Sequence, residues 1–408
     1  MKREFRGRKS GQHQSIKRKV LGNIVVIWLL TDLGCGIAYA TNVYFAGFAQ
    51  SGKYSQLEQD YPYSYNLVQT KEFRKQVLIS AKNINPINYR LRFSLSKDAK
   101  SFNSSIELAL VQDGETVSVE KYLINGNADY KLDVTLHAEA VFFDFEKKSV
   151  LYSVPISEEY INVYSHSPTE SDKLSAIKLA LYKNSGNNLL KNFQSAVNKV
   201  NLPSSVVKFV RVTNVHISSL AKTTIINHPD MGLDTNDNAK QYFANSLSSA
   251  LSGLDEIPME PYQADSTTGK FALVFSNQGE KTFNLHFPAP SYGIDLTIKG
   301  FKNVPYSSSG AGYSQIYGAF ANIKVYSPLI DKVYLDETFK NGVVKVIPIT
   351  QVTVAAGPAY LSATNRLFEK FAVALAGKDE HWLKSATSGK HVSSSMEKTY
   401  EALESCKL

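Results

Sequence analysis

The segment between Asn227 and Asn238 gathers the side chains best suited to metal binding. The candidates are His228, Asp230, Asp234, Asn236 and Asn238. The run from Asp234 to Asn238 resembles the first half of a calcium-binding loop, but Ala239 stands where that loop needs glycine and Asn245 where it needs a bidentate glutamate. Asp and Asn are also typical caps of helices. We therefore expect Asn236 or Asp237 to cap a helix and expect no metal here.

Two further patterns fail as chemical motifs. Ser307–Gly312 is rich in glycine and serine, but it lacks the lysine and the following helix of a phosphate-binding loop, so we expect a flexible loop between strands. His137, His216 and His286 lie on predicted strands, and no zinc-protease, serine-hydrolase or paired-carboxylate signature occurs. We predict no catalytic, cofactor or metal site, although a triad assembled in space is recognised by geometry alone.

A tyrosine-rich segment is the candidate binding element. Tyr54, Tyr61, Tyr63 and Tyr65 cluster around Pro62. A tyrosine offers an apolar ring and a polar hydroxyl, so such a cluster can stack on sugars or form a protein interface. The alternative is that these tyrosines pack back onto a sheet.

Period-two patterning and turn residues predict a strand-rich first half. The expected strands are 42–48, 77–80, 89–95, 106–111, 117–123, 134–145 and 149–154. Asp113-Gly114 and Asn125-Gly126 are read as turns between them. Later strands are expected at 206–217, 271–275, 282–287, 294–298, 318–326, 332–339 and 343–354.

Helical spacing predicts three amphipathic regions and an internal repeat. The expected helices cover Leu174–Tyr182 with Asn187–Val200, Asn236–Gly253 and Ala359–Ala376. The segments 140–200 and 320–376 share a hairpin, a Leu-Ser-Ala tripeptide and a helix. We predict an α+β fold of antiparallel sheets with packed amphipathic helices, in two related modules.

The N-terminal forty residues resemble an export signal. A basic stretch precedes the apolar run Val20–Leu30, and Ala38-Tyr39-Ala40 is a leader-peptidase site, so we expect cleavage between Ala40 and Thr41. An uncleaved membrane anchor is the alternative, although Asn23 and Asp32 disfavour it. A lipoprotein with acylated Cys35 is the third possibility.

Charge and cysteine content exclude several classes. The net charge is +8, but residues 1–40 hold eight Lys/Arg against Glu4 and Asp32, which is +6 and leaves about +2 for the rest. This balance argues against a nucleic-acid partner. After cleavage Cys406 is the remaining cysteine, which excludes an internal disulfide and a cysteine zinc site.

The expected organisation is a signal peptide at 1–40, a β-rich α/β module at 41–203, a second α/β module at 204–376 and a flexible polar tail at 377–408. The tail includes one short helix through Met396, Tyr400 and Leu403. We expect it to be mobile unless a partner binds it.

The order of helices and hairpins over Val206–Ala376 resembles the periplasmic α/β modules of the TolB amino-terminal and curli-secretion-channel kind. The resemblance rests on element order and transfers no site residues. It implies a non-catalytic subunit of a periplasmic or outer-membrane assembly in a Gram-negative bacterium, of a secretion, motility or surface apparatus. Its partners would be other envelope proteins, with peripheral membrane association as an option. The alternatives are a periplasmic carbohydrate- or lipid-binding protein and a periplasmic hydrolase.

Overall fold

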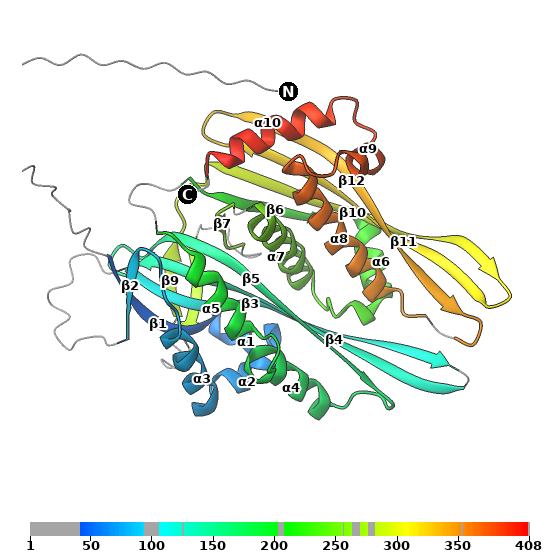
Figure 1. Ribbon diagram of the computed structural model, residues 1–408, viewed down its shortest axis with the longest axis horizontal. Helices are drawn as coiled ribbons and strands as arrows, with labels where there is room; N and C mark the ends of the chain where they lie inside the picture. The colour runs from blue at the N-terminus through cyan, green and yellow to red at the C-terminus, as the bar shows by residue number, and fades with distance from the viewer. Residues whose placement is uncertain are drawn as a thin grey trace, which may run out of the picture. The chain divides into compact units, whose positions relative to one another are not determined.

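The computed structural model describes residues 41–93, 106–124, 126–202, 208–255, 257–262, 270–275, 282–351 and 354–406. All of them fall in one unit of the chain, Ala40–Leu408. The predicted leader, with Val20–Ala40 and Cys35, lies outside the described residues, and Thr41 begins the first strand. Two β-sheets and packed helices confirm the predicted α+β class (Figure 1).

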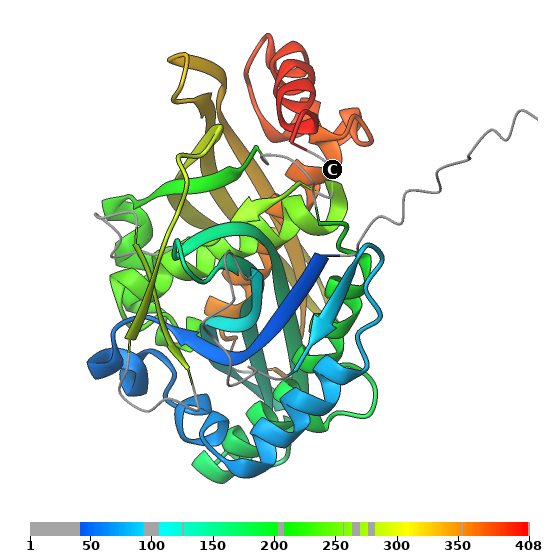
Figure 2. The same ribbon diagram turned by 90° about the vertical axis from the view of Figure 1, so that its left-hand side faces the viewer.

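The first sheet has the strand order β2-β1-β3-β4-β5-β9-β8. Its strands are β1 (Thr41–Ser51), β2 (Tyr89–Arg92), β3 (Ile106–Ile124), β4 (Asn127–Asp144), β5 (Ser149–Tyr164), β8 (Lys270–Phe275) and β9 (Thr282–His286). β1 is parallel to β2 and β3, and β3, β4 and β5 form an antiparallel meander. β8 also pairs with the end of β1, so the sheet closes on itself there (Figure 2).

The second sheet has the order β12-β11-β10-β6-β7. Its strands are β6 (Val210–Ile217), β7 (Met259–Glu260), β10 (Tyr292–Ser309), β11 (Gly312–Ser327) and β12 (Lys332–Pro348). β6 is parallel to β10, and β10, β11 and β12 form an antiparallel meander. Buried residues alternate along β11 from Tyr317 to Val325, because one face of this sheet packs on helices.

The helices bury the apolar faces of both sheets. Those of the first half are α1 (Leu57–Asp60), α2 (Ser64–Val68), α3 (Lys71–Lys82), α4 (Glu170–Lys178) and α5 (Leu189–Lys199). Those of the second half are α6 (Ser219–Asn227), α7 (Asn236–Asp255), α8 (Gly357–Leu375), α9 (Glu380–Ala386) and α10 (Val392–Glu404). Helical turns η1 (Tyr54–Gln56), η3 (Leu179–Lys183) and η4 (Pro229–Met231) join them. α7 contacts β6 of the second sheet and also β3 and β5 of the first, so it packs between the two (Figure 1).

Both sheets follow the same chain path. Each path begins with a strand, a helical crossover and a second strand parallel to the first, and it ends with two antiparallel strands and a helix. In the first half these strands and helices are β1, β3, β4, β5 and α4–α5. In the second half they are β6, β10, β11, β12 and α8. The two Leu-Ser-Ala tripeptides lie in α4 and α8, which follow the meander in each copy. This shared path agrees with the prediction of two related modules.

Two predicted elements of the first half are wrong. Residues 77–80 form part of helix α3, because Phe73, Val77 and Ala81 are buried at a spacing of four residues and Thr70 caps the helix through the Phe73 N–H. The predicted strands 106–111 and 117–123 are one strand, β3. Asp113-Gly114 forms a β-bulge within β3, where the register to β4 shifts between Gln112 and Gly114.

The module boundary and the tail also differ from expectation. Strands β8 and β9 come from the expected second module but join the first sheet. Residues 380–404 form α9 and α10, in which Trp382, Leu383, Met396 and Leu403 are buried in the core of the second sheet. The predicted short helix through Met396 is confirmed as α10, whereas a mobile tail is wrong for this segment.

Gly232 provides a test of the packing between the two halves. It has φ +68°, and an added Cβ would lie 2.6 Å from the Val117 carbonyl oxygen of β3. Gly377 has a similar φ of +72° with nothing within 4 Å, so Gly377→Ala is the matched control for backbone strain alone. Gly232→Ala is expected to lower the free energy of unfolding, measured with urea, by about 1–3 kcal/mol more than Gly377→Ala does. Equal losses would mean that the η4–β3 contact does not exist.

Candidate functional site

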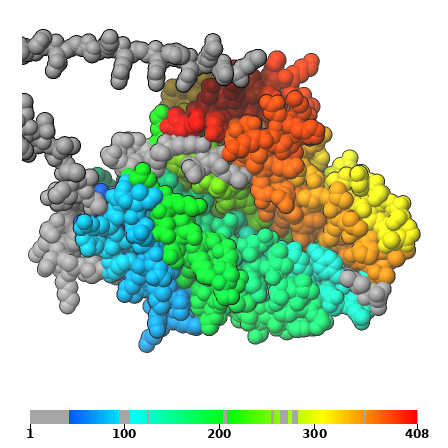
Figure 3. All heavy atoms as spheres, in the orientation of Figure 1, coloured from blue at the N-terminus to red at the C-terminus, as the bar shows by residue number. Residues whose placement is uncertain are grey.

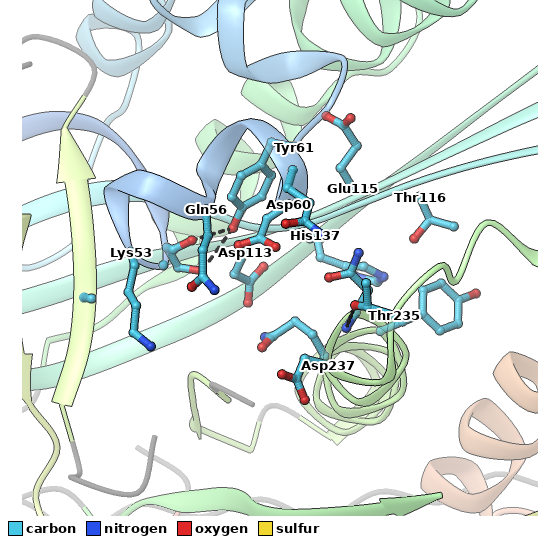
Figure 4. A pocket seen from close by; sticks show the side chains of 18 of the residues that line it. Lys53, Gln56, Asp60, Tyr61, Asp113, Glu115, Thr116, His137, Thr235 and Asp237 are labelled. Carbon is cyan, nitrogen blue, oxygen red and sulfur yellow. Dashed lines mark hydrogen bonds between the residues drawn. The ribbon is translucent and has the colours of Figure 1, made fainter. Parts of the chain in front are cut away.

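A cavity of about 420 Å³ lies beside the bulge of β3. Its wall comes from residues within 51–61, 113–116 and 235–242, with His137 of β4, Ala272 of β8 and Thr282 and Asn284 of β9. Figure 4 shows the turn after β1, the bulged strand and the start of α7 around this space. The first and last of these segments belong to the helical crossovers of the two repeated halves, so both halves contribute to one cavity.

The bulge places Asp113 in the cavity wall. The extra residue in β3 breaks the pairing to β4, and Gly114 allows the strands to approach closely, because a Cβ there would lie 3.2 Å from the Cβ of His137. Asp113 is 3% exposed, and its carboxylate oxygen Oδ1 has no hydrogen-bond partner. Burial raises the pKa of Asp113 to about 7.

His137 is the second buried polar group of the wall. It is 5% exposed, neither ring nitrogen has a hydrogen-bond partner, and its ring meets Tyr242 edge-on with centroids 5.7 Å apart. Burial lowers the pKa of His137 to about 4, so the ring is neutral near pH 7. A neutral imidazole offers one donor and one acceptor nitrogen to a bound molecule.

The rest of the wall is acidic and rich in amides. Its titratable groups are Lys53, Asp60, Tyr61, Asp113, Glu115, His137, Asp237 and Tyr242. Burial, reinforced by the charge of Asp237, raises the pKa of Asp60. Glu115 accepts hydrogen bonds from the Tyr63 and Ser64 N–H groups at 2.8 and 2.9 Å. The Glu115 carboxylate is thus held by the start of α2, and Asp237 pairs with Lys240 at 3.5 Å. Asp60, Asp113 and Asp237 remain around the space with one wall lysine, Lys53, which favours a cationic ligand over an anionic one.

Buried carboxyl groups continue behind the cavity to the second sheet. Glu139 of β4 is 2% exposed, and burial followed by the charge of Asp113 raises its pKa well above the ordinary value. Glu260 of β7 is fully buried with a pKa raised by burial to about 8, although Arg211 lies 3.3 Å away. Ser153 of β5 donates to the carbonyl of Met259 and so joins the two sheets at this place.

The tyrosine-rich segment packs inward. Tyr61 is buried with its hydroxyl 2.9 Å from the Ser51 carbonyl oxygen, and Tyr54 and Tyr65 pack on the cluster of Leu57, Tyr61 and Val274. The hydroxyl of Tyr63 accepts from Lys173 at 3.3 Å, and that ammonium also lies over its ring. Of the four tyrosines, Tyr61 alone lines the cavity among the described residues. A shared tyrosine platform for sugars is therefore not formed, and their role in binding stays a prediction.

The calcium-like loop has structural roles. Asp230 accepts from the Gly357 N–H at 2.9 Å, and Thr235, rather than Asn236 or Asp237, caps α7 through the Asn238 N–H at 3.1 Å. Asn238 lines the cavity. Within the described ranges, no group of three or more His, Cys, Asp or Glu side chains is placed to hold a metal ion.

The glycine/serine segment ends a long hairpin. Ser307–Ser309 belong to β10, which pairs closely with β11 from Gly312, so the expected flexible loop is reduced to Gly310 and Ala311. We name residues 302–318 and 342–348 the β10–β12 arm. Lys345 of this arm pairs with Glu120 and lies over the Tyr122 ring at 5.4 Å, so one face of the arm contacts the β3–β4 hairpin.

The opposite face of the arm is apolar and exposed. Val304, Ile316 and Val344 stand opposite one another in the pairing register, and Val346 follows on the same side. Val344 is 55% exposed and Val346 is 70% exposed. These four residues are the arm face. Figure 3 shows the yellow and orange atoms of β10–β12 at the surface, at the right of the view.

No protein-family model and no curated protein sequence matches this chain. Similar solved structures are the hypothetical protein CT253 from Chlamydia trachomatis (10% identity, TM-score 0.24, 41% of this chain and 96% of that one) and XCC0632 from Xanthomonas campestris, of family DUF330 (9%, 0.20, 44% and 86%). A homolog of a neuraminyllactose-binding hemagglutinin from Helicobacter pylori is similar at 12% identity and TM-score 0.24, over 49% of this chain and 95% of that one.

These scores are too low for an argument about fold or function, and the TolB and curli resemblance stays unconfirmed. No helix among the described residues is both long and apolar enough to cross a membrane.

Proposed function

We propose that this chain is an exported, non-catalytic protein of the bacterial envelope that serves as a subunit of an assembly. The basic and apolar leader with its Ala-x-Ala site supports export. The observation that carries the assembly role is the arm face, where valines stand exposed on paired strands. Exposed apolar patches commonly mark protein interfaces.

The partner that fits the arm face is a protein with an apolar surface of its own. The four members of the arm face, Val304, Ile316, Val344 and Val346, are uncharged. The charged residue of the arm on the same side is Lys302, two residues before Val304, and it is exposed at the edge of the patch, where its ammonium stays in water. The charged Lys345 points to the opposite face, where Glu120 neutralises it. Partner binding would therefore remove valines from water without burying a charge.

Substitution of the arm face tests this function. Wild-type protein, extracted from the envelope of the cell that produces it, is expected to elute in gel filtration as a complex larger than the single chain. Val346→Asp should reduce the complex to the free chain, because a buried unpaired carboxylate costs several kcal/mol. Ile226→Asp on α6 is the control, since Ile226 is 67% exposed but lies outside the arm.

Both variants should unfold at the same urea concentration as wild type, because both sites are solvent-exposed. A free chain in the wild-type extract would overturn the assembly role. If both variants reduced the complex equally, the partner interface would not lie on the arm face.

The cavity supports a second function, the binding of a small polar ligand. Its volume of about 420 Å³ falls within the ordinary range for ligand sites, and the unpartnered Asp113 and His137 line it. Its polar wall fits a sugar or an amine better than a lipid. We do not propose hydrolysis. In a catalytic triad the histidine is hydrogen-bonded to a serine and a carboxylate, whereas neither ring nitrogen of His137 in the cavity wall has a hydrogen-bond partner.

A further inference from the structure

We propose that the cavity binds a small organic cation that carries a primary ammonium group, with the Asp113 carboxylate as its counter-ion. This inference deepens the second proposed function and is independent of the assembly role. It rests on a buried acceptor that the protein itself does not satisfy, in a wall where carboxyl groups outnumber basic ones.

The first argument is the state of Asp113. Its Oδ1 is buried and unpartnered while the residue lines a cavity of ligand size. A buried carboxylate is costly unless a cation or hydrogen-bond donors compensate it. Its raised pKa of about 7 reports that cost in the unbound protein. A bound ammonium would supply the missing charge.

The second argument is the number of acceptors. An ammonium has three N–H donors and no acceptor, so its site needs about three oxygen or nitrogen acceptors. Asp113 Oδ1 and both ring nitrogens of neutral His137 are unpartnered, and the residues Gln56 and Asn238, whose side-chain amides each contain one acceptor oxygen, also line the wall. Figure 4 shows Asp60, Asp113 and Asp237 from three separate segments around the same space.

The third argument excludes other ligands. An anion would meet the carboxyl groups of Asp60, Asp113 and Asp237, and within the described residues no cluster of three ligands could hold a metal ion. A neutral sugar could bond to the amides but would leave the charge of the ionised Asp113 uncompensated. An organic cation meets all of these conditions.

The proposal implies a defined pH dependence. Asp113 must be ionised to bind, and the fraction ionised rises from about one tenth at pH 6 to about nine tenths at pH 8 for a pKa of about 7. The apparent affinity should therefore rise about tenfold over that range. The charged or titratable groups around Asp113 are Lys53, Asp60, Tyr61, Glu115, His137, Glu139 and Asp237. His137 is neutral throughout this range because its pKa is about 4.

The test is calorimetric titration of the purified chain with matched pairs of probes. Putrescine is compared with 1,4-butanediol, and glucosamine with glucose. At least one amine is expected to bind, and its neutral partner at least tenfold more weakly. The affinity for putrescine, whose alkylammonium groups stay charged in this range, should rise from pH 6 to pH 8. Asp113→Asn, which preserves shape, should weaken amine binding at least tenfold.

Controls separate the site from general charge effects. Asp336→Asn removes an exposed carboxylate of β12 outside the cavity and should bind amines as wild type does. Asp237→Asn should weaken binding a few-fold, and it keeps the test decisive if Asp113→Asn does not fold, because its side chain is 62% exposed.

The proposal is overturned if neither amine binds, if the neutral partner binds equally, or if both Asp113→Asn and Asp237→Asn leave the affinity unchanged. Binding of glucose equal to that of glucosamine would keep the cavity as a ligand site while rejecting the cation. Neither result bears on the arm face, which is tested by complex size.

Discussion

Replacing Trp382 with alanine is expected to lower the free energy of unfolding by about 3–5 kcal/mol, the usual cost of removing a buried tryptophan. Trp382 is 6% exposed, and its ring stacks on Phe339 with centroids 6.1 Å apart. Phe339 in turn meets Phe371 of α8 at 5.2 Å. The loss would therefore leave a void between α9, β12 and α8.

Urea unfolding followed by circular dichroism measures this loss. Lys384→Ala is the matched control, because it lies in the same helix with its side chain 73% exposed. Its ion pair with Glu380 is exposed and should contribute at most about 1 kcal/mol. A Trp382→Ala protein as stable as Lys384→Ala would mean that residues 380–404 are not part of the core.

Stability is expected to fall as the pH rises from about 4.5 to about 8. The pKa values of Asp113, Glu107 and Glu260 are raised by burial to about 7, 7 and 8, and that of Glu139 is raised well above its ordinary value. The folded chain therefore binds more protons than the unfolded chain in this window. The contribution of these carboxyl groups to stability is fully present below their unfolded pKa values and is lost as the pH rises through the folded ones.

Between pH 6.5 and 8.5 the expected loss is on the order of a few kcal/mol, since one pKa unit corresponds to about 1.36 kcal/mol. His137 acts in the opposite sense, but only below about pH 6.5, because its pKa is lowered in the folded state. Urea midpoints between pH 6.5 and 8.5 therefore report the carboxyl groups, opposed in the upper part of this window by Lys345, whose pKa burial lowers to about 8. Glu139→Gln should reduce the change of the urea midpoint with pH, whereas Glu401→Gln, at an exposed position, should keep the wild-type change.

An unchanged urea midpoint in the wild-type protein across pH 6.5–8.5 would contradict the burial of these groups. A flat dependence in both variants would show that the observed slope has another origin.

Long periodic elements were predictable from sequence. Helices α5, α7 and α8 each bury one apolar face, and strands β11 and β12 alternate regularly, so local patterning identifies them. Helix α3 was mistaken because its Val77–Ser80 run is rich in apolar and β-branched residues, although its buried positions are four residues apart. The packing of α3 in the tertiary fold determines that this segment is a helix.

The cavity could not be found from sequence. Its wall joins residues 51–61, 113–116 and 235–242, which are remote along the chain. Asp113-Gly114 has the composition of a turn, and only the pairing of β3 with β4 reveals a bulge that turns Asp113 inward. The burial of the C-terminal segment could not be predicted either. Its buried residues are widely spaced among polar ones; they are Trp382, Leu383, Met396 and Leu403.

Site-specific photo-crosslinking in the producing cell tests the central claim, that this protein is an envelope subunit whose arm face binds a partner. A benzophenone amino acid would replace Val346 in one strain and Ile226 in another, since both positions are similarly exposed. The account predicts a single adduct with an envelope protein from position 346 and none from position 226. No adduct from position 346, or the same adducts from both positions, would contradict it.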